Sequence, residues 1–175
     1  MSAMVRYLKD LGHTDIAFVG ELNTMSKLTA YRKAMNTLKI PYTSENEYII
    51  NARFEEIGHQ AALQIMQKRK LPTAIICAYD EIALKMIHDF CQCGIKIPEQ
   101  VSIIGINDIP MSSYAPIPLT TMRIFQEEQG ALAVNLLYNK IFENPDITQH
   151  ISIGHQLIER KSVGKAPKNC YNERV

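Results

Sequence analysis

The chain has 175 residues, of which 46% are hydrophobic and 21% are charged, so it can bury one substantial core. Its 19 basic and 18 acidic residues give a net charge of +1 and form no basic stripe, which argues against DNA binding by this chain alone. No apolar run approaches the roughly 18 residues of a membrane span, and the N-terminus lacks the pattern of a signal peptide. We therefore expect a cytoplasmic globular protein that does not contact membranes.

The sequence carries no metal, cofactor or catalytic motif. Cys91-Gln92-Cys93 is too closely spaced for a zinc site and has no second pair of ligands. The phosphate loop, the nucleophile elbow, the zinc-protease motif and the dinucleotide-binding glycine motif are all missing. The histidines lie in separate predicted elements, and His13, which follows a helix-ending glycine, is expected to be a packing or capping group. We therefore expect a protein that is not an enzyme, with no cofactor and no metal.

Helices and strands alternate through the N-terminal part of the chain. Met4, Val5, Leu8 and Leu11 recur at helical spacing, and Gly12 stands where the C-terminus of a helix favours glycine. The elements expected here are a helix over 4–11, a strand over 15–20, a helix over 26–38, a strand over 47–50 and a helix over 54–70.

Two short apolar runs flank a helical stretch in the middle of the chain. Residues 74–77 and 101–105 are predicted strands, and the helix predicted over 80–93 supplies the crossover that a parallel pair requires. Tyr79-Asp80 follows the first strand, and Asn107-Asp108 follows the second. Both pairs therefore emerge at the same carboxyl edge of the sheet, where ligands of open α/β sheets bind.

An extended segment and a long helix follow. Residues 119–124 are rich in β-formers, and a helix is predicted from Phe125 or Gln126 to Phe142, with a break at Asn144-Pro-Asp. Strands that alternate with helices in this way predict an α/β fold with an open, doubly wound parallel sheet. The remaining expected elements are a hairpin-type or edge pair over 149–153 and 155–160 and a polar, fraying tail over 164–175.

Four motifs occur in a characteristic order and spacing. They are Ala78-Tyr-Asp-Glu-Ile-Ala-Leu84, Gly94-Ile-Lys-Ile-Pro98, Val101-Ser-Ile-Ile-Gly-Ile-Asn-Asp-Ile-Pro110 and Pro118-Leu-Thr-Thr121. Together with Gly12-His13 before Ile16-Ala-Phe18, they resemble the effector-binding domain of LacI/GalR-family bacterial transcription regulators. The resemblance implies a periplasmic-binding-protein-like fold, in which the chain crosses three times between two subdomains and a sugar lies in the cleft between them.

The resemblance also implies a division of the chain. Residues 1–124 correspond to the C-terminal subdomain, 125–148 to the crossover and a helix of the N-terminal subdomain, 149–163 to a returning strand segment and 164–175 to a flexible tail. The family's helix-turn-helix head and most of its first subdomain match no part of the sequence. We therefore expect a chain that carries half of the binding cleft, with operator DNA bound only through a head outside it.

Effector contacts are implied at the carboxyl edge. Lys27, four residues before the aromatic Tyr31, stands where the family has a sugar-contacting arginine; it keeps the charge but loses the bidentate fork, and a solvated lysine is the alternative. Tyr79 can stack on a ring or donate its hydroxyl. Asp80 is either a ligand group or the cap of the next helix. Asn107 takes the position that touches the sugar, and Asp108 has a turn or cap role.

Three further positions complete the implied ligand site. Phe54 opens the third helix as the family's aromatic, although spacing from Gly58 selects Arg53 instead. Phe125 is favoured as the cleft aromatic, although the alignment selects its neighbour Gln126. Asn23 lies in the loop after the first strand. Arg123-Ile124-Phe125 resembles members that sense galactosides, so the implied effector is a carbohydrate and possible galactoside.

A symmetric homodimer is the other expected assembly. One apolar helical face is explained by the sheet, and a second needs a partner. The dimer residues that the resemblance implies are Ala83, Leu84, Ile87 and His88 on the central helix and Met111, Tyr114 and Ala115 on the turn after it.

The function predicted from the sequence is therefore the sugar-binding and dimerisation domain of a LacI-type regulator, a repressor of carbohydrate-utilisation genes. A free-standing sugar-binding receptor of the same fold is the first alternative, and the missing export signal opposes it. A nucleotide-dependent α/β enzyme is the second, and the missing phosphate loop opposes that.

Overall fold

The computed structural model of the protein describes residues 1–142 and 148–167. The strands are β1 (Ile16–Gly20), β2 (Glu47–Ile49), β3 (Ala74–Cys77), β4 (Ser102–Asn107), β5 (Thr120–Ile124) and β6 (His155–Ile158). The helices are α1 (Ser2–Asp10), α2 (Met25–Thr37), α3 (Phe54–Met66), α4 (Asp80–Gln92), α5 (Met111–Tyr114) and α6 (Gln126–Phe142), with short 3-10 turns η1 (Leu22–Thr24) and η2 (Ser44–Asn46).

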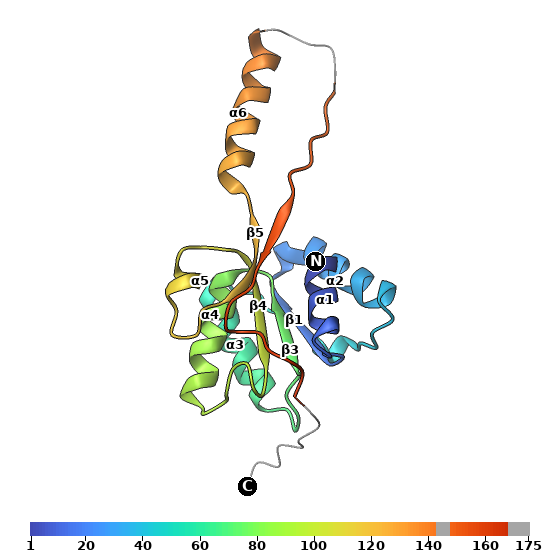
Figure 1. Cartoon of the computed structure of the whole chain (residues 1–175), viewed down its shortest axis with the longest axis vertical. Helices are drawn as coiled ribbons and strands as arrows, with labels where there is room; N and C mark the ends of the chain where they lie inside the picture. The colour runs from blue at the N-terminus through green and yellow to red at the C-terminus, as the bar shows by residue number, and fades with distance from the viewer. Residues whose placement is uncertain (143–147, 168–175) are drawn as a thin grey trace.

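The sheet is open and almost entirely parallel. Its strand order is β2-β1-β3-β4-β5-β6, and all neighbours are parallel except β5 and β6, which pair antiparallel. Figure 1 shows α1 and α2 on one side of this sheet and α3 and α4 on the other. Because both faces are covered, β1 and β3 are buried along their whole length. The predicted doubly wound parallel sheet is confirmed.

Two buried polar groups fix the α1–α2 side of the body. The Tyr31 hydroxyl of α2 donates to the Ile16 carbonyl at 2.8 Å. His13 is fully buried, its Nε2 lies 3.0 Å from the Gly164 carbonyl oxygen, and burial lowers the pKa of its ring. A neutral imidazole donates this bond without placing a charge in the core. His13 is therefore the packing group that the sequence predicted.

The C-terminal segment packs differently from the prediction. The hairpin-type pairing of 149–153 with 155–160 is wrong, because β6 pairs with β5 and residues 149–153 form no strand. Residues 164–167 are held rather than frayed, since the Gly164 amide donates to Ser102 Oγ at 3.1 Å and the Ala166 amide to the Leu11 carbonyl at 2.9 Å. Residues 168–175 lie outside the described part of the chain.

Helix α6 projects away from the body. It begins at Gln126, is reached through β5, and stands clear of the other helices, with the segment that leads to β6 returning beside it (Figure 1). None of its residues is buried, and the apolar side chains of Val134, Leu137, Tyr138, Ile141 and Phe142 are exposed. The break expected at 144–146 falls outside the described residues. Of the described helices, none is long and apolar enough to span a bilayer.

Candidate functional site

The carboxyl ends of the parallel strands share one edge. β1, β3, β4 and β5 run in the same direction, so the residues that follow them emerge together. Tyr79 and Asp80 come after β3, and Asn107 ends β4. The edge is therefore the one at which the sequence placed a ligand site.

Lys27 reaches this edge from the first turn of α2. Its Nζ donates to the Ala78 carbonyl at 2.6 Å and lies 3.8 Å from the centroid of the Tyr79 ring. Burial lowers the pKa of Lys27 to about 8, although the negative charges of Glu81, Glu21 and Asp80 oppose this shift. Lys27 is thus a partly buried cation beside an aromatic ring, and the alternative of a solvated lysine is wrong.

An aromatic pair and an arginine extend the site along the edge. The rings of Phe54 and Tyr79 meet edge to face with centroids 5.8 Å apart. The Arg53 guanidinium lies 4.7 Å from the Phe54 centroid, and its Nε lies 3.5 Å from the buried carboxylate of Glu21. Phe54 has φ of 44°, an unfavourable conformation for an aromatic residue that turns the chain at the start of α3. Both residues between which the register was open therefore lie at this edge.

A pocket of about 300 Å³ opens beside Lys27. It lies between the first turns of α1 and α2, the ends of β4 and β5, the start of α6 and the segment before β6. Its volume is within the range of small-molecule sites, and apolar walls with a few polar groups are typical of them. The lining residues are Met1, Met4, Ser26, Lys27, Ala30, Ile106, Met122, Ile124, Gln129, Ile153, Gly154 and His155.

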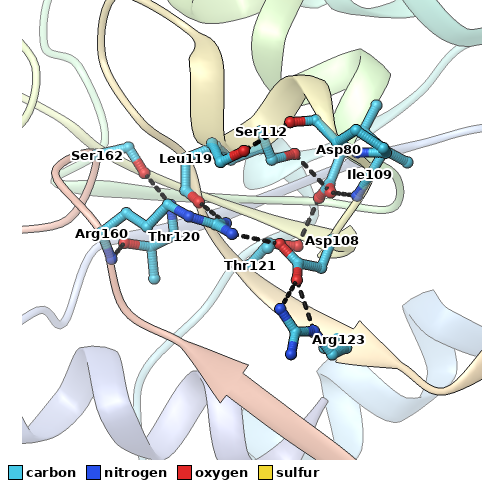
Figure 2. Close-up of polar contacts among 12 residues, drawn as sticks. Asp80, Asp108, Ile109, Ser112, Leu119, Thr120, Thr121, Arg123, Arg160 and Ser162 are labelled. Atoms are coloured by element: carbon cyan, nitrogen blue, oxygen red, sulfur yellow. Dashed lines mark hydrogen bonds and ion pairs between the residues drawn. The ribbon is translucent and has the colours of Figure 1, made fainter.

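Asp80 does not cap the helix, and its carboxylate is buried rather than exposed at the edge. It is fully buried as the first residue of α4, and Tyr79 holds the cap position without a side-chain capping bond. One carboxylate oxygen accepts from Thr121 Oγ1 at 2.6 Å, and the other accepts from Ser112 Oγ at 2.8 Å and the Ile109 amide at 2.9 Å (Figure 2). Burial raises the pKa of Asp80, and these hydrogen bonds oppose the rise. Asp80 therefore holds together the segments that form the edge, through its hydrogen bonds to Ile109, Ser112 and Thr121.

The turn after β4 is held in an uncommon conformation. Asn107 and Asp108 have φ of 128° and 58°, in a region that non-glycine residues seldom occupy. Asn107 is half-buried at the end of β4, beside Arg123 of β5. Asp108 points to two arginine side chains, Arg123 and Arg160 (Figure 2). The turn role expected for Asp108 thus comes with a pair of ionic contacts.

No resident metal is indicated by this geometry. Within 1–142 and 148–167, no group of three His, Cys, Asp or Glu side chains is arranged to hold an ion. The edge instead combines one lysine, an aromatic pair, a planar amide and a pocket. Such a set can bind a small polar molecule through hydrogen bonds and ring contacts.

Comparison with known proteins identifies the fold family. A family profile described as a periplasmic binding protein-like domain matches residues 5–163. The chain belongs to this family. The predicted resemblance to the effector-binding domain of LacI/GalR-type regulators is confirmed by the same match and by the relatives that follow.

The curated relatives of this periplasmic binding protein-like domain include transcriptional repressors. The HTH-type transcriptional repressor PurR of Proteus mirabilis is 33% identical over 167 residues, which are 93% of this chain and 48% of that protein. The PurR of Histophilus somni is 35% identical over 163 residues, which are 90% of this chain and 48% of the relative. The chain spans about half the length of the curated relatives it matches.

Solved structures show the same architecture. A putative transcriptional regulator LacI from Bacillus cereus subsp. cytotoxis superposes with a TM-score of 0.87 at 28% identity, over 94% of this chain and 59% of that one. A LacI family regulator from Enterococcus faecium with bound ribose gives a TM-score of 0.82 at 23% identity, over 94% of this chain and 62% of that one. The second likeness shows the fold alone.

The remaining predicted contacts are dispersed around the candidate site. Asn23 is exposed on η1, and Phe125 is half-buried between β5 and α6. Neither Phe125 nor Gln126 lines the pocket, whereas Gln129 does. Gln129 lies one helical turn after Gln126, so its face was predictable once the start of α6 was known. His155 was missed because it enters from a segment that no local pattern places near Lys27.

The predicted dimer surface is partly inside the subunit. Ala83 and Ile87 are buried in the core, because α4 packs against α3 as well as against the sheet. The second apolar face of α4 therefore does not require a partner subunit. The prediction that Ala83 and Ile87 form dimer contacts is wrong, because both are buried inside the chain. Leu84 and Ala115 are half-buried, and His88, Met111 and Tyr114 are exposed, so they remain available on the surface.

Proposed function

We propose that this domain senses a small carbohydrate for a LacI-type repressor that acts in the cytoplasm. The observation that carries the proposal is Lys27, whose ammonium lies on the Tyr79 ring and whose side chain lines a pocket at this edge. Sugars offer hydroxyl groups to charged and amide side chains and a C–H face to aromatic rings. Ribose bound to a LacI family regulator and cellobiose bound to the regulator CelR support this effector class.

The effector would act by shifting a population of conformations. β5 and β6 lead from the edge to α6, so we infer that residues 125–148 and the returning segment connect to a second subdomain that closes over the edge. An effector that binds the closed state more tightly moves the equilibrium toward it. Operator affinity and effector affinity are then reciprocally coupled.

Calorimetric titration of the intact protein that contains this chain tests the effector class. Galactose, lactose, melibiose, raffinose, ribose and cellobiose form the first panel, and purine bases and nucleotides form the second. We expect a member of the first panel to bind with a dissociation constant in the micromolar to millimolar range, and Lys27→Ala to weaken it about tenfold or more. Lys85→Ala is the matched control, because Lys85 pairs with Asp89 on α4, away from the edge.

Three other outcomes separate the alternatives. Binding of a purine base and no sugar would overturn the carbohydrate part while leaving the sensing role. Binding of a sugar with no effect on operator affinity would favour the free-standing receptor. Turnover of a nucleotide would favour the α/β enzyme.

A further inference from the structure

Asp108 joins three separate parts of the chain. Its side chain is only 4% exposed, although it lies in the turn directly after Asn107, the last residue of β4. Oδ2 accepts from Arg123 Nε and Nη2, both at 2.6 Å, and Oδ1 accepts from Arg160 Nη2 at 2.7 Å. Figure 2 shows the two guanidinium groups approaching this carboxylate from different segments, Arg123 from β5 and Arg160 from the segment after β6.

The two arginines lie on or directly after the strands that connect the body with α6. Arg123 is in β5, which leads out to α6, and Arg160 follows β6, which leads back. Arg160 is further fixed by its Nη1, which donates to the Leu119 carbonyl at 2.8 Å, and by its amide, which donates to Thr120 Oγ1 at 2.9 Å. A shift of β6 relative to β5 would therefore move the Arg160 guanidinium that contacts the Asp108 carboxylate.

The turn itself is strained and pinned from both sides. Asn107 and Asp108 both have positive φ, a conformation that is unfavourable for residues other than glycine and persists only where the surroundings enforce it. On one side Asp80 holds the Ile109 amide, and on the other the two arginines hold Asp108. The same contacts that keep the strands together therefore keep Asn107 in its strained position.

We propose that Asp108 is a positioning residue that couples the effector-facing turn to the strands leading to and from α6. This inference rests on the proposed function, since Asn107 matters only where the edge binds an effector. A movement of the strands changes the conformation of the turn through Asp108. A change in the conformation of the turn, in the same way, shifts the strands. Charge-assisted hydrogen bonds at low solvent exposure are well suited to this role because they are strong and form only over a small range of distances and angles.

Hydrogen exchange in the absence of any effector tests the coupling, so a failure here is distinct from a failure to find a sugar. In the intact protein, Asp108→Asn should raise amide exchange about tenfold or more both in residues 107–109 and in β6. β6 pairs with β5 and not with β4, so its response reports transmission through the side chain. Arg160→Gln should produce the reciprocal effect, faster exchange at 107–109, and Arg160→Lys should recover part of it by keeping the charge.

Asp89→Asn is the matched control. Asp89 is also a shielded carboxylate with two cationic partners, Lys85 and His59, but it lies between α3 and α4. It should leave both 107–109 and β6 unchanged. Faster exchange confined to the altered residue's own segment, or an equal rise in every element including α3 and α4, would overturn the proposal. If Asp108→Asn does not fold, the comparison of Arg160→Gln with Arg160→Lys decides it alone.

Discussion

Asp80 is surrounded by donors on every side that the structure describes. Its carboxylate joins the start of α4 to α5 through Ser112, to the turn through the Ile109 amide and to β5 through Thr121. A buried charge is stable only when such bonds replace its hydration. Asp80, which the sequence suggested as a sugar contact, thus holds in place the segments that carry other candidate contacts.

Replacing Asp80 should separate its charge from its hydrogen bonds. Asp80→Ala leaves three buried donors without an acceptor, each costing on the order of 1 kcal/mol, so the free energy of unfolding should fall by several kcal/mol. Asp80→Asn keeps an acceptor and should cost less.

Because burial raises the pKa of Asp80 above its ordinary 3.8, its contribution to stability is present below that value and is lost as pH rises through the raised pKa. The stability of the wild type relative to Asp80→Asn, measured by urea unfolding, should therefore decrease from low to neutral pH; an increase would contradict the raised pKa.

Lys27 should titrate far below an ordinary lysine. Its folded pKa is about 8 against an ordinary 10.5, so the unfolded state binds more protons between these values, and stability should rise with pH across that window. Nuclear magnetic resonance of labelled lysine side chains should show one transition near pH 8. Lys27→Met should abolish it. A spectrum in which no lysine titrates below about pH 9 would contradict the burial of this ammonium.

Local patterns placed Tyr79 and Asn107 at strand ends, and the family resemblance added Lys27, but neither could assign the role of Asp80. The position of a polar residue between a strand and a helix is visible in the sequence, and parallel strands bring such positions to one edge. The partners of Asp80 lie 32 and 41 residues away, at Ser112 and Thr121. Whether a carboxylate faces solvent or a cluster of hydroxyls depends on these distant contacts, which no local pattern contains.

Strand β4 passes so close to α4 that one position must be glycine. A Cβ on Gly105 would lie 2.2 Å from Asp80 Oδ1 and 2.9 Å from Leu119 Cδ2. Gly105→Ala should therefore displace the Asp80 carboxylate and lower the free energy of unfolding by about 1–3 kcal/mol. Gly130→Ala in α6 is the matched control, since nothing lies within 4 Å of its Cβ, and it should be neutral or slightly stabilising. Equal effects in chemical unfolding would contradict the close packing.

The exposed face of α6 provides a second test at this scale. In the 175-residue chain, Leu137→Gln should change the free energy of unfolding by no more than about 0.5 kcal/mol, because Leu137 is exposed. In the intact protein, the same substitution should cost about 2 kcal/mol or more if a second subdomain covers this face. Calorimetric unfolding of both forms measures the difference. Small changes in both would show that the face stays open.

The helices and strands themselves were more predictable than which of them pair or pack together. The short apolar runs and the helices between them indicated β1 to β5 and their parallel order, because a crossover helix permits few other topologies. The pairing of β6 with β5 was missed, since the two are separated by α6 and the segment after it. The burial of Ala83 and Ile87 was missed for a related reason: helical periodicity shows that a face is apolar but not whether α3 or another subunit covers it.

At the scale of the whole molecule, we propose that exposed residues of α4 and α5 form a dimer surface. Met111 and Tyr114 are 59% and 84% exposed on α5, and His88 is exposed on α4. The proposed regulator would place two copies of this domain face to face about a two-fold axis.

Sedimentation equilibrium of the intact protein should show a dimer. Tyr114→Asp should raise the dimer dissociation constant about tenfold or more, because a charge would be placed in the proposed contact. Leu22→Asp, an exposed apolar residue on η1 at the α1–α2 side, should not change it. A monomeric wild type, or equal effects of the two substitutions, would contradict the proposed surface.

The projecting helix α6 has the length of a lever arm. Its 17 residues make a rod about 25 Å long, since each residue adds roughly 1.5 Å. A tilt of about 5° at its base would swing the far end by roughly 2 Å. A rotation too small to disturb the hydrogen bonds of the sheet is thereby magnified into a displacement that can make or break packing at the tip.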